Sequence, residues 1–327
     1  MKRLLVLAVA ATAILANAQT FPGTKPVTFV VPFAAGGPTD RVARDLAEAM
    51  RKAIPGSNFV VENVNGAGGT IGAAKVARAA PDGHTLLLHH IGMAAAPGLY
   101  RKLPYKVLDD FEFLGMINEV PMTIIGKPQL PANNYRDLEN YIKANSGKLN
   151  IAHAGLGSAS HLCGLMWQAA INAKEAMTTI PFSGTAPAMN ALVGGQVDMM
   201  CDQTTNTTGQ IESGRVKAYA VTTTKPLSGN KLLKDYPTLQ EMGLKGFDLT
   251  IWHGLYAPKG TPPAVLAQLN AGLKAALKDA DFLKKEDALG AVVVTDRRVE
   301  PAAHKAFVSA EINKLKPVID AAGKYAD

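Results

Sequence analysis

The chain has 327 residues, of which 47% are hydrophobic and 19% charged, so its composition is that of a globular protein rather than a disordered one. Its formal net charge of +7 is spread along the sequence without a run of five Lys or Arg, and aromatic residues make up only 6%. This pattern argues against nucleic-acid binding and fits an ordinary solvated surface.

The N-terminus is typical of a secretory signal peptide, which we place at residues 1–18. A positive start is followed by an apolar run at 4–15, which is too short to cross a membrane, and then by the small residues Ala16-Asn17-Ala18. No later stretch approaches the roughly 18 apolar residues of a spanning helix. We therefore expect an exported, periplasmic protein that begins at Gln19 and has no lipid anchor.

Strands alternate with helices in the next part of the chain. Thr28–Val31 precedes a glycine turn and a helix at 39–53. Further strands are expected at 58–62, 84–89, 113–125, 150–153, 177–182, 197–202 and 217–224. This alternation predicts parallel α/β sheets, which bind ligands where strands end.

Four glycine-rich or small-residue loops follow these strands, two in each half, at 34–40, 65–70, 154–161 and 182–187. This pseudo-repeat predicts two facing α/β lobes, joined by crossovers at 122–128 and 250–258. We place lobe 1 at 19–124 and 250–327, and lobe 2 at 125–249. An amphipathic helix is expected at 263–278, with Leu269 and Leu273 on its apolar face.

The first two loops have the chemistry of an anion site. At 35–39 a helix begins, and its free N–H groups and dipole can bind a carboxylate without a basic side chain. We expect Asp40 to cap amides or order water. The second loop, 66–72, has the spacing GxGxxxG, and Asp82 falls in a turn, so NAD binding is disfavoured and no cofactor is predicted.

Ser158, His161 and Asp202 raise the alternative of a hydrolase. The nucleophile elbow GxSxG is absent, and a base three residues after its nucleophile on one helix aims poorly. We interpret Ser158 and Ser160 as N-caps that also donate to a ligand. No catalytic residue is predicted, and a hydrolase that uses Ser158 and His161 remains the alternative.

The remaining polar residues leave several readings open. Because side chains alternate along a strand, only one of His89 and His90 can face a cleft, either as a donor or as packing. No His, Cys, Asp or Glu cluster has the spacing of a metal site, so no metal is predicted. Cys163 and Cys201 can form a disulfide or stay as two thiols, and the sequence favours neither.

Several segments in order resemble the Bug proteins, the extracytoplasmic solute receptors of the tripartite tricarboxylate transporter family. They are "VPFAAGGPTD", "VENVNGAGGTIGA", "PDGHTLLL", "GLGSASHL", "IPFSGTAPAMNALVGGQVDMMCD", "SGRVKAYAVTTTKP" and "IWHGLYAPKGTPPAVLAQLNAGLKAAL". The resemblance implies a type II periplasmic binding protein fold, in which two α/β lobes close on a small carboxylate. It also implies a two-component membrane permease as partner.

The resemblance also implies which residues bind. In the family the first-lobe loops hold one carboxylate through backbone amides and ordered water. The expected ligand-binding residues are Phe33, Ala35, Gly36, Gly37, Thr39, Asp40, Gly66, Ala67, Gly68, Gly69, Thr70, His89, His90, Gly157, Ser158, Ser160, Phe182, Thr185, Asp202 and Thr204. His89-His90 and the polar segment "QTTNTTGQI" depart from many members, which leaves the ligand's identity open.

We therefore expect a monomeric periplasmic receptor that closes on a C4–C6 dicarboxylate, or on an aromatic carboxylate such as terephthalate, and delivers it to the permease. Nicotinate-like monocarboxylates and amino acids are further candidates. A sensor that reports to a signalling receptor is an alternative role, because one fold can serve both.

Overall fold

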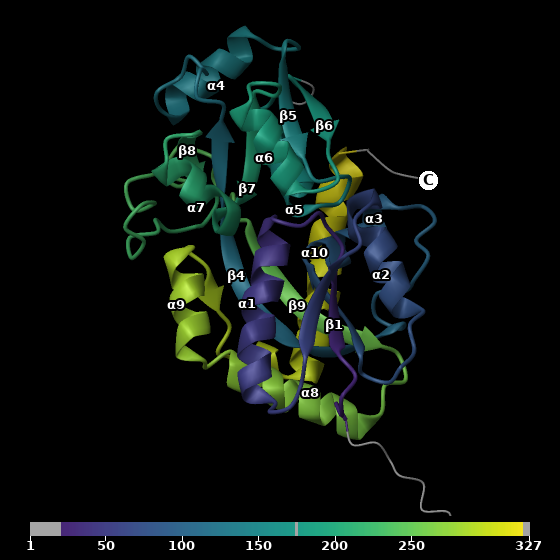
Figure 1. Ribbon diagram of the computed structural model, residues 1–327. Helices are drawn as coiled ribbons and strands as arrows, with labels where there is room; N and C mark the ends of the chain where they lie inside the picture. Colours follow the sequence, from purple (N-terminus) through teal and green to yellow (C-terminus); the bar gives the residue numbers. More distant parts are fainter. Residues whose placement is uncertain (1–20, 174–175, 323–327) are drawn as a thin grey trace, which may run out of the picture.

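The computed structural model describes residues 21–173 and 176–322. The predicted signal peptide lies outside the described residues. Figure 1 shows two α/β bodies, one above the other, and we call the lower one lobe 1 and the upper one lobe 2. Within the part of the chain that is described, no helix combines the length and the apolar character needed to cross a membrane.

Lobe 1 is built on a sheet of order β2-β1-β3-β9-β4, in which β1 pairs in parallel with β2 and β3. Its strands are β1 (Val27–Val31), β2 (Phe59–Asn63), β3 (Thr85–His90), β9 (Thr250–Pro258), β10 (Val292–Val293) and the first part of β4 (Phe111–Gly126). Its helices are α1 (Pro38–Ala53), η1 (Ala67–Gly69), α2 (Thr70–Ala77), α3 (Gly92–Leu99), α8 (Pro263–Ala276), α9 (Ala280–Ala288), η2 (Arg297–Val299) and α10 (Pro301–Ala322).

Lobe 2 continues the sheet as β4-β7-β5-β6, with β8 also paired to β4. Its own strands are β5 (Leu149–His153), β6 (Met177–Pro181), β7 (Met199–Gln203) and β8 (Lys217–Val221). Its helices are α4 (Tyr135–Ala144), α5 (Ala159–Ala170), α6 (Thr185–Val193) and α7 (Thr204–Glu212). A disulfide joins Cys163 on α5 to Cys201 on β7, with Cα atoms 6.0 Å apart, which decides between the two readings of the cysteines.

The long strand β4 belongs to both lobes. It pairs with β9 from Phe111 to Pro121 and with β7 from Met122 to Gly126. The change of partner falls where the first crossover is expected, and β9 spans the residues of the second. The division of the chain at 124/125 and 249/250 remains a prediction.

Hydrophobic periodicity explains the elements around the cleft. The residues of β1 are almost all buried, as expected for a strand covered on both faces. Helix α1 begins at Pro38, where proline is tolerated, and turns Val42, Leu46 and Met50 into the core. On α8, the expected residues Leu269 and Leu273 are buried.

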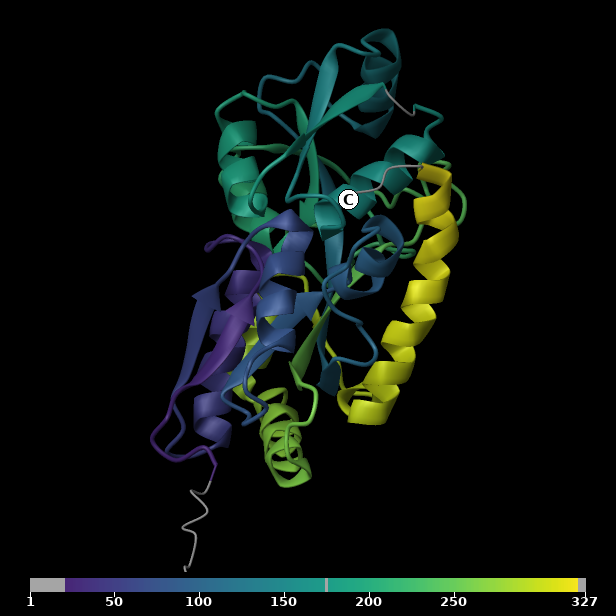
Figure 2. The same cartoon turned by 90° about the vertical axis from the view of Figure 1, so that its right-hand side faces the viewer.

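The C-terminal helices α9 and α10 were not anticipated. In Figure 2, α10 runs along one side of the molecule, where it packs against α3 and β4. Helix α9 contributes Glu286, a fully buried carboxyl that bonds to Asn118 of β4.

Candidate functional site

A small cavity lies where the two lobes meet, and its volume is about 10 Å³, close to the space of a single water. Six expected residues line it, namely Phe33, Thr39, His90, Ser158, Ser160 and Thr185. Four lining residues were not expected, namely Pro38, Ala154, Ala159 and Gln203. In this conformation the lobes are closed, so entry of an organic ligand requires them to separate.

Helix N-termini converge on this cavity from both lobes. Thr39 lies at the start of α1, Ser158 is the N-cap of α5, Thr185 opens α6, and Gln203 is the N-cap of α7. Of the described residues that line the cavity, none is Lys or Arg. Helix N-termini carry free N–H groups and the positive end of the helix dipole, so an anion can bind here without a basic side chain.

A groove of about 440 Å³ opens beside the cavity, between the loop at 66–68 and lobe 2. Gly66, Ala67, Gly68 and Phe182 line it, together with Tyr100 and Leu156. Thr70 lines a separate hollow on the flank of α2, and its hydroxyl donates to the carbonyl of Ala67 at 3.0 Å. The second loop thus forms the rim of the cleft rather than the wall of the cavity.

The expected amide cap by Asp40 is confirmed. Its carboxylate accepts the N–H of Gly36 at 2.9 Å and also binds Arg44 and Asn63. Burial alone would raise the pKa of Asp40, but these hydrogen bonds outweigh burial and hold the pKa below its usual value. The Gly36 amide is therefore used within the loop, and Ala35 and Gly36 are exposed.

Gly37 and Gly69 are sites of close approach. A Cβ on Gly37 would lie 3.1 Å from the Thr185 hydroxyl across the cleft. Gly69 has a φ of +101°, and a Cβ there would lie 2.8 Å from Nε2 of His89. A larger residue would therefore be tightly packed at Gly37 and would clash with His89 at Gly69, where the backbone conformation also favours glycine.

The two histidines at the end of β3 have separate environments. His89 accepts the N–H of His90 on its Nδ1 atom at 2.8 Å and lies outside the cavity lining. His90 accepts the N–H of Gly92 on Nδ1 at 2.9 Å, and its ring stacks on Phe33. Burial lowers the pKa of His90 to about 3 and that of His89 well below its usual value, so both rings are neutral. Of the pair only His90 lines the cavity, as strand alternation predicts.

Ser158 and Ser160 have different roles. Ser158 is the N-cap of α5 and accepts the backbone N–H of His161 at 3.2 Å, as expected. Ser160 is not an N-cap: it lies within the first turn, and its hydroxyl accepts the N–H of Ala154 at 2.9 Å. The Nδ1 atom of His161 accepts the N–H of Gly157. The geometry found for Ser158 is thus that of a cap to the backbone.

A set of buried oxygens with no hydrogen-bond partner among the described residues lies where β7 ends and α7 begins. The set comprises one oxygen each of Asp202, Gln203, Thr204 and Thr205. Burial raises the pKa of Asp202 to about 7, although the Asn206 side chain, which donates to its other oxygen, and the backbone N–H of Gln203 oppose this shift. Buried polar atoms are almost always paired, so these atoms call for a ligand or water. Gln203 and Thr205 were missed, although the polarity of "QTTNTT" pointed to this segment.

Contacts between the lobes surround the groove. The Tyr100 hydroxyl lies 2.6 Å from the carbonyl oxygen of Ala67 in lobe 1 and 2.8 Å from that of Leu156 in lobe 2. A Cβ on Gly68 would lie only 1.7 Å from the same Leu156 oxygen. Nothing in the sequence singled out Tyr100, because its role depends on how closely the lobes approach.

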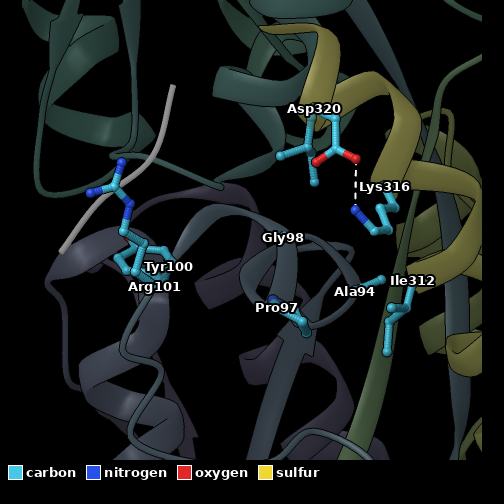
Figure 3. A pocket seen from close by; sticks show the side chains of 9 residues that line it. Ala94, Pro97, Gly98, Tyr100, Arg101, Ile312, Lys316 and Asp320 are labelled. Carbon is cyan, nitrogen blue, oxygen red and sulfur yellow. Dashed lines mark hydrogen bonds and ion pairs between the residues drawn. The ribbon is translucent and has the colours of Figure 1, made fainter. Parts of the chain in front are cut away.

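A further hollow of about 430 Å³ lies between α3 and α10, outside the cleft (Figure 3). Its lining combines apolar side chains such as Pro97 and Ile312 with a Lys316–Asp320 ion pair. None of the expected ligand-binding residues lines it, and all of its lining residues lie on or next to α3 and α10 rather than across the two lobes. The smaller cavity in the cleft is therefore the better candidate site.

Comparison with known proteins identifies the family. The model of the "Tripartite tricarboxylate transporter family receptor" matches residues 42–324. The chain belongs to this family. Its members are substrate-binding receptors rather than enzymes, which removes the hydrolase alternative.

Three solved structures of similar receptors confirm the type II periplasmic binding protein fold. The periplasmic binding protein BugD is 50% identical, with a TM-score of 0.88 over 92% of this chain and 99% of its own. MatC from Rhodopseudomonas palustris, with bound malate, is 40% identical, with a TM-score of 0.85 over 90% of this chain and 98% of its own. Rpa4515 from R. palustris, with adipate, is 30% identical, with a TM-score of 0.85 over 93% and 98%.

Proposed function

We propose that this receptor captures an open-chain dicarboxylate of the C4–C6 range in the periplasm and delivers it to a tripartite tricarboxylate-type permease. The observation that carries the proposal is the convergence of four helix N-termini, those of α1, α5, α6 and α7, on one closed cavity. Helix N-termini bind anions through N–H groups and dipoles. Their origin in both lobes suits a ligand with a carboxylate at each end.

The ligand class is supported by the chemistry of the two walls. On lobe 1, Thr39 and His90 line the cavity, and on lobe 2 the hydroxyls of Ser158 and Thr185 and the amide of Gln203 do so. MatC and Rpa4515 hold malate and adipate, which are both open-chain dicarboxylates. The cavity in this conformation holds no more than about one water, so the choice of an open-chain ligand rests on these two relatives and on the wall chemistry rather than on its volume.

The test is a binding screen on the purified protein after ligand has been stripped by unfolding and refolding. The panel is succinate, L-malate, adipate, terephthalate, benzoate and nicotinate, measured by thermal shift and then by calorimetry. A ligand at 100 times its Kd stabilises the folded state by about 2.7 kcal/mol, which raises the melting temperature measurably. Stabilisation by none of succinate, L-malate and adipate would sink the proposal, even if terephthalate raised the melting temperature.

A matched pair of variants tests whether binding uses the cavity. Thr185→Val removes a lining hydroxyl without changing its volume, and we expect at least a fivefold weaker Kd. Thr178→Val makes the same change at an exposed position on β6 of the same lobe and should leave Kd unchanged. Equal Kd values for the two variants would place the ligand elsewhere.

Membership of the family supports delivery to a permease, and the periplasmic homologues and the predicted signal peptide support a periplasmic location. We expect cells that carry the receptor and its permease to take up the labelled ligand, and cells that lack the receptor to lose that uptake. Uptake that is independent of the receptor, with a transcriptional response that depends on it, would indicate the sensor role.

A further inference from the structure

Behind the cavity, a buried hydrogen-bond network connects Thr39 to the far side of lobe 1. The Thr39 hydroxyl lies 3.3 Å from Nε2 of His253, and Nδ1 of His253 lies 2.8 Å from Oδ1 of Asn118. The Asn118 amide nitrogen then donates to Oε2 of Glu286 at 2.5 Å. The four side chains come from α1, β9, β4 and α9, and none is more than 2% exposed. We call these four residues the Thr39 network.

The network has a defined direction, which starts at the carboxyl group. Oε2 of Glu286 accepts from the Asn118 amide, so Oδ1 of Asn118 faces His253 and can only accept. His253 must therefore carry a proton on Nδ1. Burial lowers the pKa of His253 well below its usual value, so the ring is neutral and its Nε2 is bare. The hydrogen of the Thr39 hydroxyl consequently points to His253.

The direction given by the Asn118–Glu286 bond is compatible with either charge state of Glu286. Burial raises the pKa of this carboxyl to about 7, opposed by the hydrogen bond from Asn118. Its second oxygen, Oε1, has no partner among the described residues, so it can carry a proton while Oε2 still accepts. Thr39 therefore presents only oxygen lone pairs to the cavity.

The neighbouring His90 has the opposite polarity. Its Nδ1 accepts the Gly92 N–H, so the proton of the neutral ring is on Nε2. His90 and Thr39 both line the cavity, and the ring centroids of His90 and His253 lie 6.0 Å apart. The lobe 1 wall thus combines one N–H donor with one hydroxyl acceptor side by side.

We propose that Thr39 is a specificity-determining residue that selects dicarboxylates with a hydrogen-bond donor on the carbon beside a carboxylate, and that His253, Asn118 and Glu286 are its positioning residues. This inference rests on the proposed function. The carboxylate accepts from His90, and a hydroxyl or ammonium group beside it donates to Thr39. A ligand without that donor leaves the Thr39 oxygen buried and unpaired, which is the type of mismatch that gives strong discrimination.

The experiment is a set of Kd ratios measured by calorimetry on the purified protein with L-malate, L-aspartate and succinate. Succinate lacks the donor, malate carries a hydroxyl and aspartate an ammonium group, so the two substituted ligands distinguish the two sources of the donor. We expect succinate to bind at least tenfold more weakly than malate or aspartate. Thr39→Ser keeps the hydroxyl and should therefore leave the ratio of the succinate Kd to the malate or aspartate Kd unchanged. Thr39→Val removes the hydroxyl and should reduce this ratio to less than threefold.

Two variants at Asn118 test the positioning residues without touching the cavity. Asn118→Asp keeps an acceptor facing His253 and should preserve the ratio, with one proton shared between the two carboxyls. Asn118→Leu removes that acceptor, frees the His253 tautomer and should reduce the ratio. A role in stability alone would weaken all ligands in proportion and leave the ratio unchanged.

Three results would overturn the inference. Equal binding of succinate, malate and aspartate by the natural protein overturns it while the proposed function stands, and this result needs no variant to fold. An unchanged ratio in Thr39→Val overturns the role of Thr39, and an unchanged ratio in a folded Asn118→Leu overturns that of the network. Binding of none of the three, nor of any other open-chain C4–C6 dicarboxylate, overturns the proposed function as well.

Discussion

The two walls of the cavity differ in how their buried polar atoms are satisfied. On lobe 1, His90 and His253 are tied into hydrogen bonds that fix their protons, and Thr39 is bonded to His253. On lobe 2, Gln203 lines the cavity and its side-chain oxygen has no partner among the described residues, and the same holds for three oxygens behind it, on Asp202, Thr204 and Thr205. The first wall is therefore preorganised, and the second gains most when a ligand or water arrives, because an unpaired buried group costs about 1–3 kcal/mol.

The lobes also differ in how they are held together. Lobe 2 is stapled by the Cys163–Cys201 disulfide, which joins α5 to β7 across 38 residues, whereas the described part of lobe 1 contains no disulfide. The disulfide holds helix α5, whose N-cap is Ser158, against strand β7, which ends at Gln203. The following predictions test this contrast between the preorganised wall of lobe 1 and the disulfide-linked lobe 2.

The largest expected effect is on the free energy of unfolding when the disulfide is removed. Replacing both Cys163 and Cys201 by Ser should lower the free energy of unfolding by about 4 kcal/mol, since a closed loop of this length restricts the unfolded chain. Urea unfolding measures the loss, and hydrogen exchange locates it. Faster exchange confined to lobe 2 is expected, and the reduced natural protein serves as control. Equal acceleration in lobe 1 would contradict the contrast.

The next effect is on closure. Gly68→Ala places a Cβ against the Leu156 oxygen, and we expect at least a tenfold weaker Kd for the ligand, because a backbone clash of this kind costs roughly 1–3 kcal/mol. Gly56→Ala is the matched control: its φ of +81° imposes similar backbone strain, but nothing lies within 4 Å. If both variants weaken binding equally, strain rather than closure is responsible.

A third prediction concerns Asp202 on lobe 2. Burial raises the pKa of Asp202 to about 7 in the folded state. Between about pH 4 and pH 7 this carboxyl is therefore protonated in the folded protein and ionised in the unfolded protein. The free energy of unfolding thus falls as pH rises through this window, by about 1.4 kcal/mol per pH unit from this group. Asp202→Asn lacks this dependence, so its stability relative to the natural protein should improve from pH 5 to pH 7.

Urea unfolding at the two pH values measures that difference, and Asp82→Asn is its control. Burial favours a higher pKa for Asp82, but its bonds with Lys25 and the His84 N–H lower it overall, so its linkage lies below pH 4. The stability of Asp82→Asn relative to the natural protein should therefore be the same at pH 5 and pH 7. A flat difference for Asp202→Asn as well would show that Asp202 is ionised in the folded protein.

The parts of the fold that sequence predicted well are those with local signals. Strand runs such as Thr28–Val31 and the helix after Pro38 follow from hydrophobic period and turn residues, and they agree with β1 and α1. Helices α9 and α10 were overlooked at the sequence level. The partner of each cysteine could not be derived either, because pairing depends on how α5 packs on β7.

The site shows the same limit. Glycine loops and helix starts, together with the family resemblance, identified Thr39, Ser158 and Thr185, which all line the cavity. Asn118 and Glu286, which connect to Thr39 through His253, come from segments far apart in the chain. Only the folded sheet brings these residues together. Motif spacing carries no information about such contacts.

The smallest expected effect is at the contact between the lobes. The single hydroxyl hydrogen of Tyr100 is shared between the carbonyl oxygens of Ala67 in lobe 1 and Leu156 in lobe 2, and it can reach the Leu156 oxygen only while the lobes are closed. Tyr100→Phe should weaken the ligand Kd about fivefold, since one hydrogen bond contributes about 1 kcal/mol. The main change should be faster ligand release, measured by stopped flow, because the bridge stabilises the closed state.

The control for this prediction is Tyr105→Phe. The Tyr105 hydroxyl is buried and has no partner among the described residues, so its removal costs no hydrogen bond. We expect Kd and release rate to stay unchanged and the free energy of unfolding to stay level or rise slightly. If Tyr100→Phe leaves Kd and release rate unchanged, as Tyr105→Phe should, the Tyr100 hydroxyl does not stabilise the closed state. Closure then depends on the fit around Gly68 and on the ligand itself.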